Sequence, residues 1–459
     1  MSSPMIGPIL GNDMKKLARR LVGDRSGNFG IMTALLAVPV LGAAGMAVDF
    51  AHALSLRTQL YAAADAAAVG AISEKSPAVA KAMTMQGDGT ITVGSEDAQK
   101  MFVGQMAGET SELPIDLEIN VTKTGSVIES RVAFSAVMPT TFMQLLGRQN
   151  VTIGGTATAQ YQTPSYMDFY MLLDNTPSMG VAATPDDIER MKHATRFGNA
   201  KGKDAKCAFA CHIVSENGVE DKTSYYNVAL NNNIPIRIDV VAQATKALMQ
   251  TAEQTQTVKG QFRMAAYTFG KTAQDAQLFK VAELDENLST VGDATKNIKL
   301  MSIPFQNYNQ DQQTSFDDAL TKIEKEIKEI PGQGTSSADR QKIVFFVSDG
   351  VGDHAKPTGC TSPKGRVNST RCIEPIDTKF CEYLKKKNIK IAVLYTTYLP
   401  LEDNGFWKDW VKPFDGSIAT RMQECASPGY FFQVSLTQGI SEAMDTLFHK
   451  IVSTPRLTR

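Results

Sequence analysis

The stretch DFYMLLDNTPSMG, from Asp168 to Gly180, joins an apolar run to an acid and two hydroxyls at alternating positions. A short apolar run bounded by turn residues is typical of a strand that is buried on both faces. At the carboxyl end of this strand, Asp174, Thr176 and Ser178 can converge where open α/β sheets bind ligands. One carboxylate and two hydroxyls are hard oxygen donors, which suit Mg²⁺ or Ca²⁺ better than zinc.

The same residues resemble a known motif. Asp-x-Thr-x-Ser-Met-Gly after a hydrophobic strand is similar to the metal-ion-dependent adhesion site of von Willebrand factor A domains, whose usual form is Asp-x-Ser-x-Ser. Thr176 replaces the first serine and keeps its hydroxyl. The family also supplies a Thr and an Asp from two later loops. Here QTSFDDAL (313–320) offers Thr314, and KIVFFVSDG (342–350) offers Asp349.

This resemblance implies a fold, a metal ion and a mode of binding. The implied fold is a doubly wound, mostly parallel sheet. The implied ion is Mg²⁺, or Ca²⁺ or Mn²⁺ in its place, with one coordination position open to an Asp or Glu of a protein partner. A hard cation with few direct carboxylates keeps enough positive charge to attract such an anion. The implied metal ligands are Asp174, Thr176, Ser178, Thr314 and Asp349.

Two other interpretations of the motif compete. Asp, Thr and Ser hydrogen-bond their own backbone in turns, so the motif also fits an ordinary turn after a strand. Ser178 also suggests a hydrolase nucleophile, but a nucleophile elbow needs Gly two residues before the serine, where this chain has Thr176. The sequence offers no paired general acid and base and no His cluster, so we expect a protein that is not an enzyme.

An uncharged stretch, Phe29–Val48, follows a cluster of basic residues near the amino terminus. It has roughly the 20 residues that a helix needs to cross a bilayer core of about 30 Å. A buried core helix and a cleaved signal peptide are the alternatives, but the apolar run is longer than a typical signal h-region. The basic residues predict a cytoplasmic amino terminus and a bulk outside the cytoplasm. They are Lys15, Lys16, Arg19, Arg20 and Arg25.

The chain continues with an alanine-rich segment, from Ala51 to Ala71. Alanine has the highest helix propensity, so we expect the helix to extend beyond the membrane. Small residues recur at three- and four-residue intervals and form one narrow face. This face suits a partner helix or the chain's own next domain equally well. Its residues are Leu56, Leu60, Ala63, Ala64 and Ala67.

The amino-terminal region carries a second resemblance. RSGNFG (25–30), VDF (48–50) and LYAAADAAA (60–68) are similar to the amino terminus of TadG-like proteins of Flp (tight adherence) pilus assembly. Members of that family often join an anchored amino terminus to a von Willebrand A domain, so the two resemblances support each other. Together they imply a single-pass protein of the bacterial inner membrane with a periplasmic bulk. Its partner would be a component of the pilus-assembly machinery or of the envelope.

The patterns predict a mixed α/β chain of five parts. Strand-like alternation at 115–121, 126–137 and 150–160, with a short helix in 139–147, predicts a small α+β module without a chemical constellation. Strands that alternate with helices after residue 164 predict a mostly parallel sheet covered on both faces. The parts are a basic cytoplasmic tail (1–27), a transmembrane helix (28–48), an Ala-rich helical extension (49–80), the α+β module (81–163) and a von Willebrand A-like domain (164–459). Insertions are expected at about 181–236 and 351–376.

Six cysteines all follow the apolar stretch, and an even count outside the cytoplasm favours disulfides. Cys207 and Cys211 are close enough to bridge locally, Cys360 and Cys372 bracket the second insertion, and Cys381 and Cys425 remain as a long-range pair. Six cysteines allow fifteen connectivities, so the pairing stays open. A zinc site is disfavoured because the C-x₂-C spacing is missing.

Composition limits the possible functions. The formal net charge is -1 and charged residues make up 21%, so no broad basic field invites nucleic acid. The preferred hypothesis is a membrane-anchored extracytoplasmic protein that binds a partner through a metal ion. The alternatives are a structural periplasmic scaffold with a vestigial metal site and, less favoured, a serine or metal-dependent hydrolase.

Overall fold

The computed structural model describes residues 28–85, 87–106, 113–198, 205–276, 278–356, 359–361, 371–398, 405–434 and 439–452. These residues form two compact units. The first takes Met1–Ala82, Gly89–Lys123 and Val127–Tyr161, and the second takes Met83–Asp88, Thr124–Ser126 and Gln162–Arg459. The basic tail expected at 1–27 lies outside the described residues.

The first unit is built on one long helix, α2 (Asn28–Ala71). Its amino-terminal part is apolar and mostly uncovered, and the helix is long enough to cross a membrane. The helix continues without a break through the alanine-rich segment, as alanine propensity predicts.

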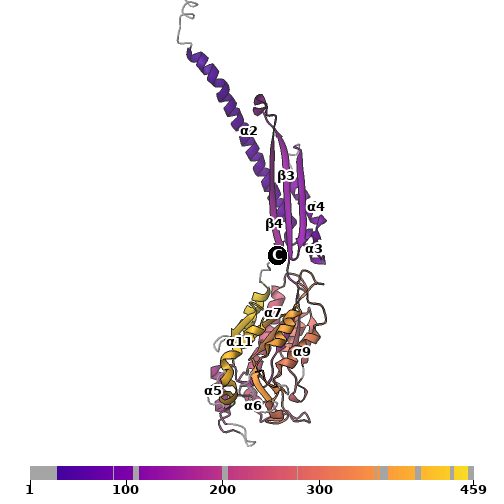
Figure 1. The fold of residues 1–459 in the computed structure, drawn as a ribbon, viewed down its shortest axis with the longest axis vertical. Coiled ribbons are helices and arrows are strands. Elements are labelled where there is room, and N and C mark those ends of the chain that lie inside the picture. The colour runs from indigo at the N-terminus through magenta and orange to yellow at the C-terminus, as the bar shows by residue number, and fades with distance from the viewer. Residues whose placement is uncertain are drawn as a thin grey trace, which may run out of the picture. The chain divides into compact units, whose positions relative to one another are not determined.

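A four-stranded sheet covers the carboxyl-terminal half of α2 (Figure 1). Its strands are β1 (Gly89–Thr90), β2 (Ile115–Thr124), β3 (Val127–Pro139) and β4 (Asn150–Gln162), in that order across the sheet. Two more helices, α3 (Pro77–Thr84) and α4 (Thr92–Gln105), and the short 3₁₀ helix η2 (Met143–Leu146) complete the unit.

The narrow face of α2 is buried within this unit. Leu56, Leu60, Ala63, Ala64 and Ala67 pack with residues of α4, β3 and β4 in one apolar core. Of the two possibilities that the sequence left open, the structure therefore shows packing on the chain's own next domain. Small side chains allow this close approach because little bulk separates the helix from the sheet.

The second unit holds a six-stranded mixed sheet with the strand order β12-β11-β8-β5-β6-β7. The central strand β5 (Met167–Leu173) pairs in parallel with β8 (Gln341–Ser348) and β6 (Phe262–Thr268). β11 (Lys390–Thr396) and β12 (Phe431–Val434) continue the parallel part. The edge strand β7 (Phe279–Asp285) is antiparallel to β6.

Helices cover both faces of this sheet because the residues of β5 alternate between two cores. Phe169, Met171 and Leu173 pack with α7 (Arg237–Thr255), α8 (Leu288–Thr295) and α12 (Ile440–Val452). Tyr170 and Leu172 pack with α9 (Phe316–Glu326), α10 (Thr378–Lys386) and α11 (Asp415–Cys425). The mixed α/β prediction with an apolar amino-terminal helix is thus confirmed.

The two segments expected as insertions carry structure of their own. Between η3 (Pro177–Gly180) and α7 lie α5 (Pro185–Ala194) and α6 (Tyr225–Asn231). After Asp349 the chain forms an antiparallel ribbon of β9 (Val351–Ala355) and β10 (Arg371–Pro375). Within the described residues, this ribbon is a two-stranded sheet apart from the six-stranded one.

Two of the three suggested cysteine pairs are disulfides. Cys360 is bonded to Cys372, and Cys381 is bonded to Cys425. The suggested local bridge between Cys207 and Cys211 is not formed. The physical reason is packing: Cys207 lies against the core shared with α7, whereas Cys211 lies against the core on the other face of the sheet. Proximity in the sequence therefore did not place the two sulfur atoms together.

Candidate functional site

The site begins where two neighbouring parallel strands end. Leu173 of β5 is in register with Val347 of β8, so the next residues of both strands emerge at the same edge of the sheet. The Asp174 amide donates to the Val347 carbonyl at 2.9 Å. The pairing of these two buried apolar strands brings Asp174 beside Ser348 and Asp349, although 174 positions separate Asp174 from Ser348 in the sequence.

Asp174 is fully buried and every oxygen of its carboxylate accepts a hydrogen bond. Oδ1 accepts from the Thr176 amide at 3.0 Å and from the Thr176 hydroxyl at 2.7 Å, and Oδ2 accepts from the Ser348 hydroxyl at 2.6 Å. The Thr176 and Ser178 hydroxyl oxygens are 3.4 Å apart. The Asp-x-Thr-x-Ser turn therefore gathers its three side chains at one point.

Asp349 is also fully buried, but its carboxylate is incompletely paired. Oδ1 accepts from the Val351 amide at 3.3 Å. Oδ2 has no hydrogen-bond partner among the described residues. A buried, unpaired carboxylate oxygen is costly, so it requires a compensating partner.

The charges at this point act on each other. Burial and, next in size, the nearby Asp174 carboxylate raise the pKa of Asp349 to about 7, against the lowering effects of Arg237 and of a hydrogen bond with Ser178. Burial also raises the pKa of Asp174, although hydrogen bonds from Ser348 and Thr176 oppose the rise. Two buried carboxylates that disfavour each other's ionisation are the arrangement that a bound cation stabilises.

Thr314 is connected to this region through backbone hydrogen bonds. It lies buried just before α9 and forms an antiparallel bridge with Asp353 of β9. The Thr314 amide donates to the Asp353 carbonyl at 2.9 Å, and the Asp353 amide donates to the Thr314 carbonyl at 3.0 Å. Contacts join Asp174, Thr176, Ser178 and Asp349 directly, whereas Thr314 is linked to them through the backbone of the β9–β10 ribbon.

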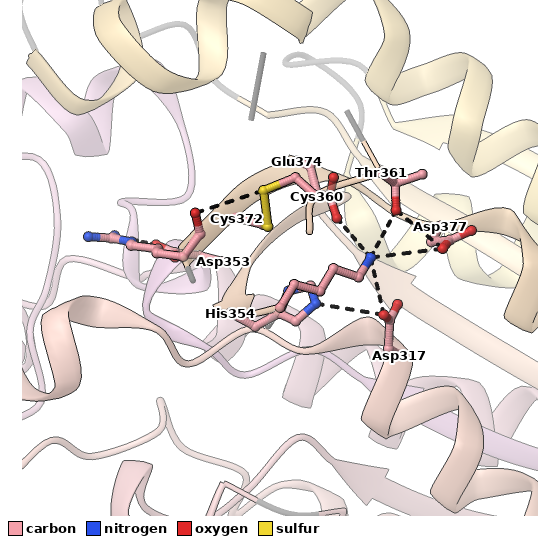
Figure 2. Close-up of a disulfide and its surroundings, with 10 residues drawn as sticks. Asp317, Asp353, His354, Cys360, Thr361, Cys372, Glu374 and Asp377 are labelled. Carbon is pink, nitrogen blue, oxygen red and sulfur yellow. Dashed lines mark hydrogen bonds and ion pairs between the residues drawn. A yellow bond between two sulfur atoms is a disulfide. The ribbon is translucent and has the colours of Figure 1, made fainter. Parts of the chain in front are cut away.

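The ribbon itself is held by charge and by a covalent bond (Figure 2). The Arg371 guanidinium donates to both carboxylate oxygens of Asp353, at 2.8 and 2.6 Å. The Lys356 ammonium lies 2.8 Å from Glu374 and 3.2 Å from Asp317 of α9. With the Cys360–Cys372 disulfide, these contacts tie the ribbon to the start of α9, where Thr314 lies.

The first insertion packs against the loop that carries Ser178. The Ala210 amide donates to the Gly180 carbonyl at 2.8 Å. A Cβ at Gly180 would lie 2.5 Å from the Ala210 carbonyl oxygen, so only glycine allows this approach. The final Gly of the quoted stretch therefore serves the contact between the site loop and residues 205–213.

Three residues near the site had no role in the sequence-based prediction. Ser348 orients Asp174 through a hydrogen bond, and the only feature of the sequence that could have indicated this role is its position directly before Asp349. Arg237 is buried, donates to the Thr397 carbonyl at 2.6 Å and carries a positive charge that acts on Asp349. Asn175 donates to the Gly270 carbonyl at 2.7 Å and accepts from the Phe269 amide, so it holds the loop after β6. Nothing in the sequence around Arg237 or Asn175 indicates that either residue lies near the site.

The residues present fit a hard divalent cation. Two carboxylates and two hydroxyls supply oxygen donors, and the unpaired Asp349 oxygen is available to a metal. No group of three or more His, Cys, Asp or Glu side chains with an arrangement that could hold a metal ion occurs in the part of the chain that the structure describes. The donor set is thus one of few acids and several hydroxyls, which differs from a zinc or carboxylate-rich calcium site.

Comparisons with known proteins identify the amino-terminal segment most clearly. Residues 27–80 match the family described as putative Flp pilus-assembly TadE/G-like. This match covers the apolar helix and its alanine-rich continuation. No curated protein matches the chain.

Solved structures with a similar arrangement include three pilus proteins. The pilus adhesin SpaC from Lactobacillus rhamnosus GG has 9% identity and a TM-score of 0.35, over 75% of this chain and 35% of that chain. The PilB minor pilin from Streptococcus sanguinis has 10% identity and a TM-score of 0.34, over 75% and 80%. The vWF domain of the type V pili tip protein Mfa5 from Porphyromonas gingivalis has 10% identity and a TM-score of 0.33, over 64% and 99%. This chain thus spans about a third of SpaC. Among these likenesses, the sequence similarity to the TadE/G-like pilus-assembly family, over residues 27–80, is the one that bears on function.

Proposed function

We propose that this chain is a membrane-anchored extracytoplasmic protein of Flp (tight adherence) pilus assembly that binds a protein partner through a metal ion. The family similarity over residues 27–80 supports a pilus-related role and favours a structural, non-enzymatic one. The apolar part of α2 supports a single-pass anchor. The second unit, proposed as a von Willebrand A-like domain, supplies the binding site.

One observation carries the metal-dependent part of this proposal. Asp349 Oδ2 is buried and has no hydrogen-bond partner among the described residues, while the Asp174 carboxylate acts on it electrostatically. Asp168, at the other end of β5, is equally buried, yet it is paired with Arg263, Arg340 and Lys342. Asp168 is therefore compensated by three cations of the chain itself, whereas Arg237 is the cation that acts on Asp349 among the described residues.

The proposed ligands are the five residues of the motif. Mg²⁺, or Ca²⁺ or Mn²⁺ in its place, would supply a positive charge that attracts an Asp or Glu of the partner. Asp174 and Asp349 would supply the negative charge at the site, and the hydroxyls of Thr176, Ser178 and Thr314 would supply neutral donors. Ser348 would keep Asp174 in place through its hydrogen bond.

Calorimetric titration of the full chain in detergent with MgCl₂, and then with CaCl₂ and MnCl₂, tests the site. We expect saturable binding that Asp174→Asn and Asp349→Asn each abolish. Asp293→Asn is the matched control, because it removes the same charge from an exposed position on α8. If the unchanged protein binds none of these ions, the metal-dependent proposal fails and the scaffold alternative takes its place.

Capture of envelope proteins on the immobilised chain, with Mg²⁺ and with chelator, then tests partner binding. A partner that is retained in Mg²⁺ and released by chelator supports the proposal. A partner that binds equally well to Asp349→Asn in chelator would show that capture uses another surface.

A further inference from the structure

The turn between β3 and β4 exposes large apolar side chains at its tip. The tip consists of residues 140–149 and contains η2. Leu145 is 82% exposed, Leu146 is 61% exposed and Phe142 is 43% exposed. Large apolar side chains gathered on one exposed turn indicate a surface that meets something other than water.

The tip is fixed to α2 by hydrogen bonds. The Asp49 carboxylate accepts from the amides of Thr141, Phe142 and Met143, at 3.1, 2.8 and 2.7 Å. Asp49 is buried by this contact although it lies on a stretch of helix that is otherwise largely uncovered. The three amides include donors at the start of η2 that would otherwise be unpaired. These hydrogen bonds therefore hold the tip against the helix.

A second contact lies nearer the amino terminus of the helix. Gly45 is buried, and a Cβ at this position would lie 2.6 Å from the Phe142 Cβ. Gly45 and Asp49 are four residues apart and so share one face of α2. Glycine at position 45 thus lets the tip approach the helix backbone closely.

These contacts place the tip at the end of the apolar stretch. Asp49 directly follows Phe29–Val48, and Gly45 lies inside that stretch, about 6 Å along the helix from Asp49 at 1.5 Å per residue. The helix surface at this level is apolar and exposed, with Leu41 at 69% and Val48 at 57%. A bilayer that surrounds the apolar part of α2 therefore reaches the level of Phe142.

We propose that the β3–β4 tip is a second membrane-contacting element, in which Phe142, Leu145 and Leu146 enter the bilayer beside α2. This inference rests on the anchor role of α2 in the proposed function, and it adds a site of lipid contact outside the family-matched segment. The occupant is the lipid of the leaflet through which α2 leaves the membrane. Arg148, exposed at the same tip, suits the headgroup phosphates of that leaflet.

Brominated lipids, which quench tryptophan fluorescence on contact, provide the test. The full chain is reconstituted into phosphatidylcholine–phosphatidylglycerol vesicles, with or without bromine on the acyl chains. Leu145→Trp and Leu146→Trp each place a probe at an exposed position, and circular dichroism checks that each variant folds. The unchanged chain gives the baseline from Trp407 and Trp410.

Val103→Trp is the matched control. Val103 is an exposed apolar residue of α4 in the same unit, 57% exposed. Its neighbour Met101 lies against Gly70, where a Cβ would be 2.5 Å from the Met101 sulfur. Gly70 is about 37 Å along the helix from Gly45, so this probe lies outside the bilayer.

We expect the brominated chains to reduce the added fluorescence of both tip variants at least twofold and to leave that of Val103→Trp unchanged. Flotation of the vesicles distinguishes failure of the membrane anchor from failure of lipid contact at the tip. Protein that does not float with the vesicles contradicts the anchor. Protein that floats but whose tip probes are quenched no more than Val103→Trp overturns lipid contact at the tip and points to a protein occupant.

Discussion

At the scale of single residues, the buried acid Asp168 of β5 is held by a network of ion pairs. Asp168 is fully buried and lies 2.8 and 2.6 Å from Arg263, 2.5 Å from Arg340 and 2.6 Å from Lys342. Burial alone would raise the pKa of Asp168, but hydrogen bonds from Arg263 and Lys342 and the charge of Arg340 lower it overall. The lowered pKa means that the folded state favours the ionised carboxylate.

Asp168→Asn should destabilise the protein strongly, because it leaves three cations beside a neutral side chain. Breaking a buried ion pair from one side costs about 3–5 kcal/mol. Urea denaturation at pH 7 measures this loss, and Asp293→Asn, at an exposed site, should change little. An Asp168→Asn variant as stable as the unchanged chain would contradict the assigned role of the network.

The same residue predicts a dependence of stability on pH. Because the folded pKa of Asp168 is below its unfolded value of about 3.9, its contribution is present above that value and is lost as the pH falls through the folded pKa. Denaturation midpoints measured between pH 6 and pH 2 should therefore fall less steeply in Asp168→Asn. Parallel curves for the two proteins would argue against this linkage.

At the scale of elements, the β9–β10 ribbon connects two parts of the candidate site. β9 begins two residues after Asp349 and pairs with Thr314 through both backbone hydrogen bonds. The disulfide Cys360–Cys372 closes the ribbon, whereas Cys381–Cys425 joins α10 to α11 within a core. One disulfide thus bears on the site and the other on the stability of the domain.

The double variant Cys360→Ser/Cys372→Ser should weaken Mg²⁺ binding about tenfold, as loss of outer support around a metal typically does. The control is Cys381→Ser/Cys425→Ser. That variant should lose about 4 kcal/mol of stability, from the chain entropy of its longer loop, but keep its affinity where it is folded. Calorimetry and denaturation of both variants measure the two effects. Equal Mg²⁺ affinities in all three proteins would separate the ribbon from the site.

At the scale of the whole molecule, the described residues include one helix that is long and apolar enough to cross a membrane, in the first unit, and two disulfides, in the second. Disulfides form in oxidising compartments and are rare in the cytosol. The basic residues before the helix favour a cytoplasmic amino terminus. Both arguments support the proposed topology, in which the chain after the apolar part of α2 lies on the extracytoplasmic side.

Reporter fusions at the carboxyl terminus test this orientation. Alkaline phosphatase fused after Arg459 should be active, because its own disulfides need the oxidising side. Changing Lys15, Lys16, Arg19, Arg20 and Arg25 to Gln should reduce that activity by allowing the reverse orientation. Activity lower than that of a fusion placed after Lys16 would contradict the predicted topology.

Local patterns in the sequence determined the elements of this protein. The uncharged stretch predicted the apolar part of α2, and alternation predicted β2, β3 and β4 close to their observed bounds. The apolar runs that end in Asp174 and Asp349 predicted β5 and β8. These predictions succeed because periodicity and propensity act between residues near in sequence.

Only the tertiary structure decided which distant residues meet. It brought the Ser348 hydroxyl within hydrogen-bond distance of Asp174 and the charge of Arg237 near Asp349. It also packed Cys207 and Cys211 against different cores. It also seated the β3–β4 tip on Asp49. Such contacts depend on strand order and on packing, which local patterns do not encode. A buried carboxylate is recognised as unpaired only after every possible partner has its place in the fold.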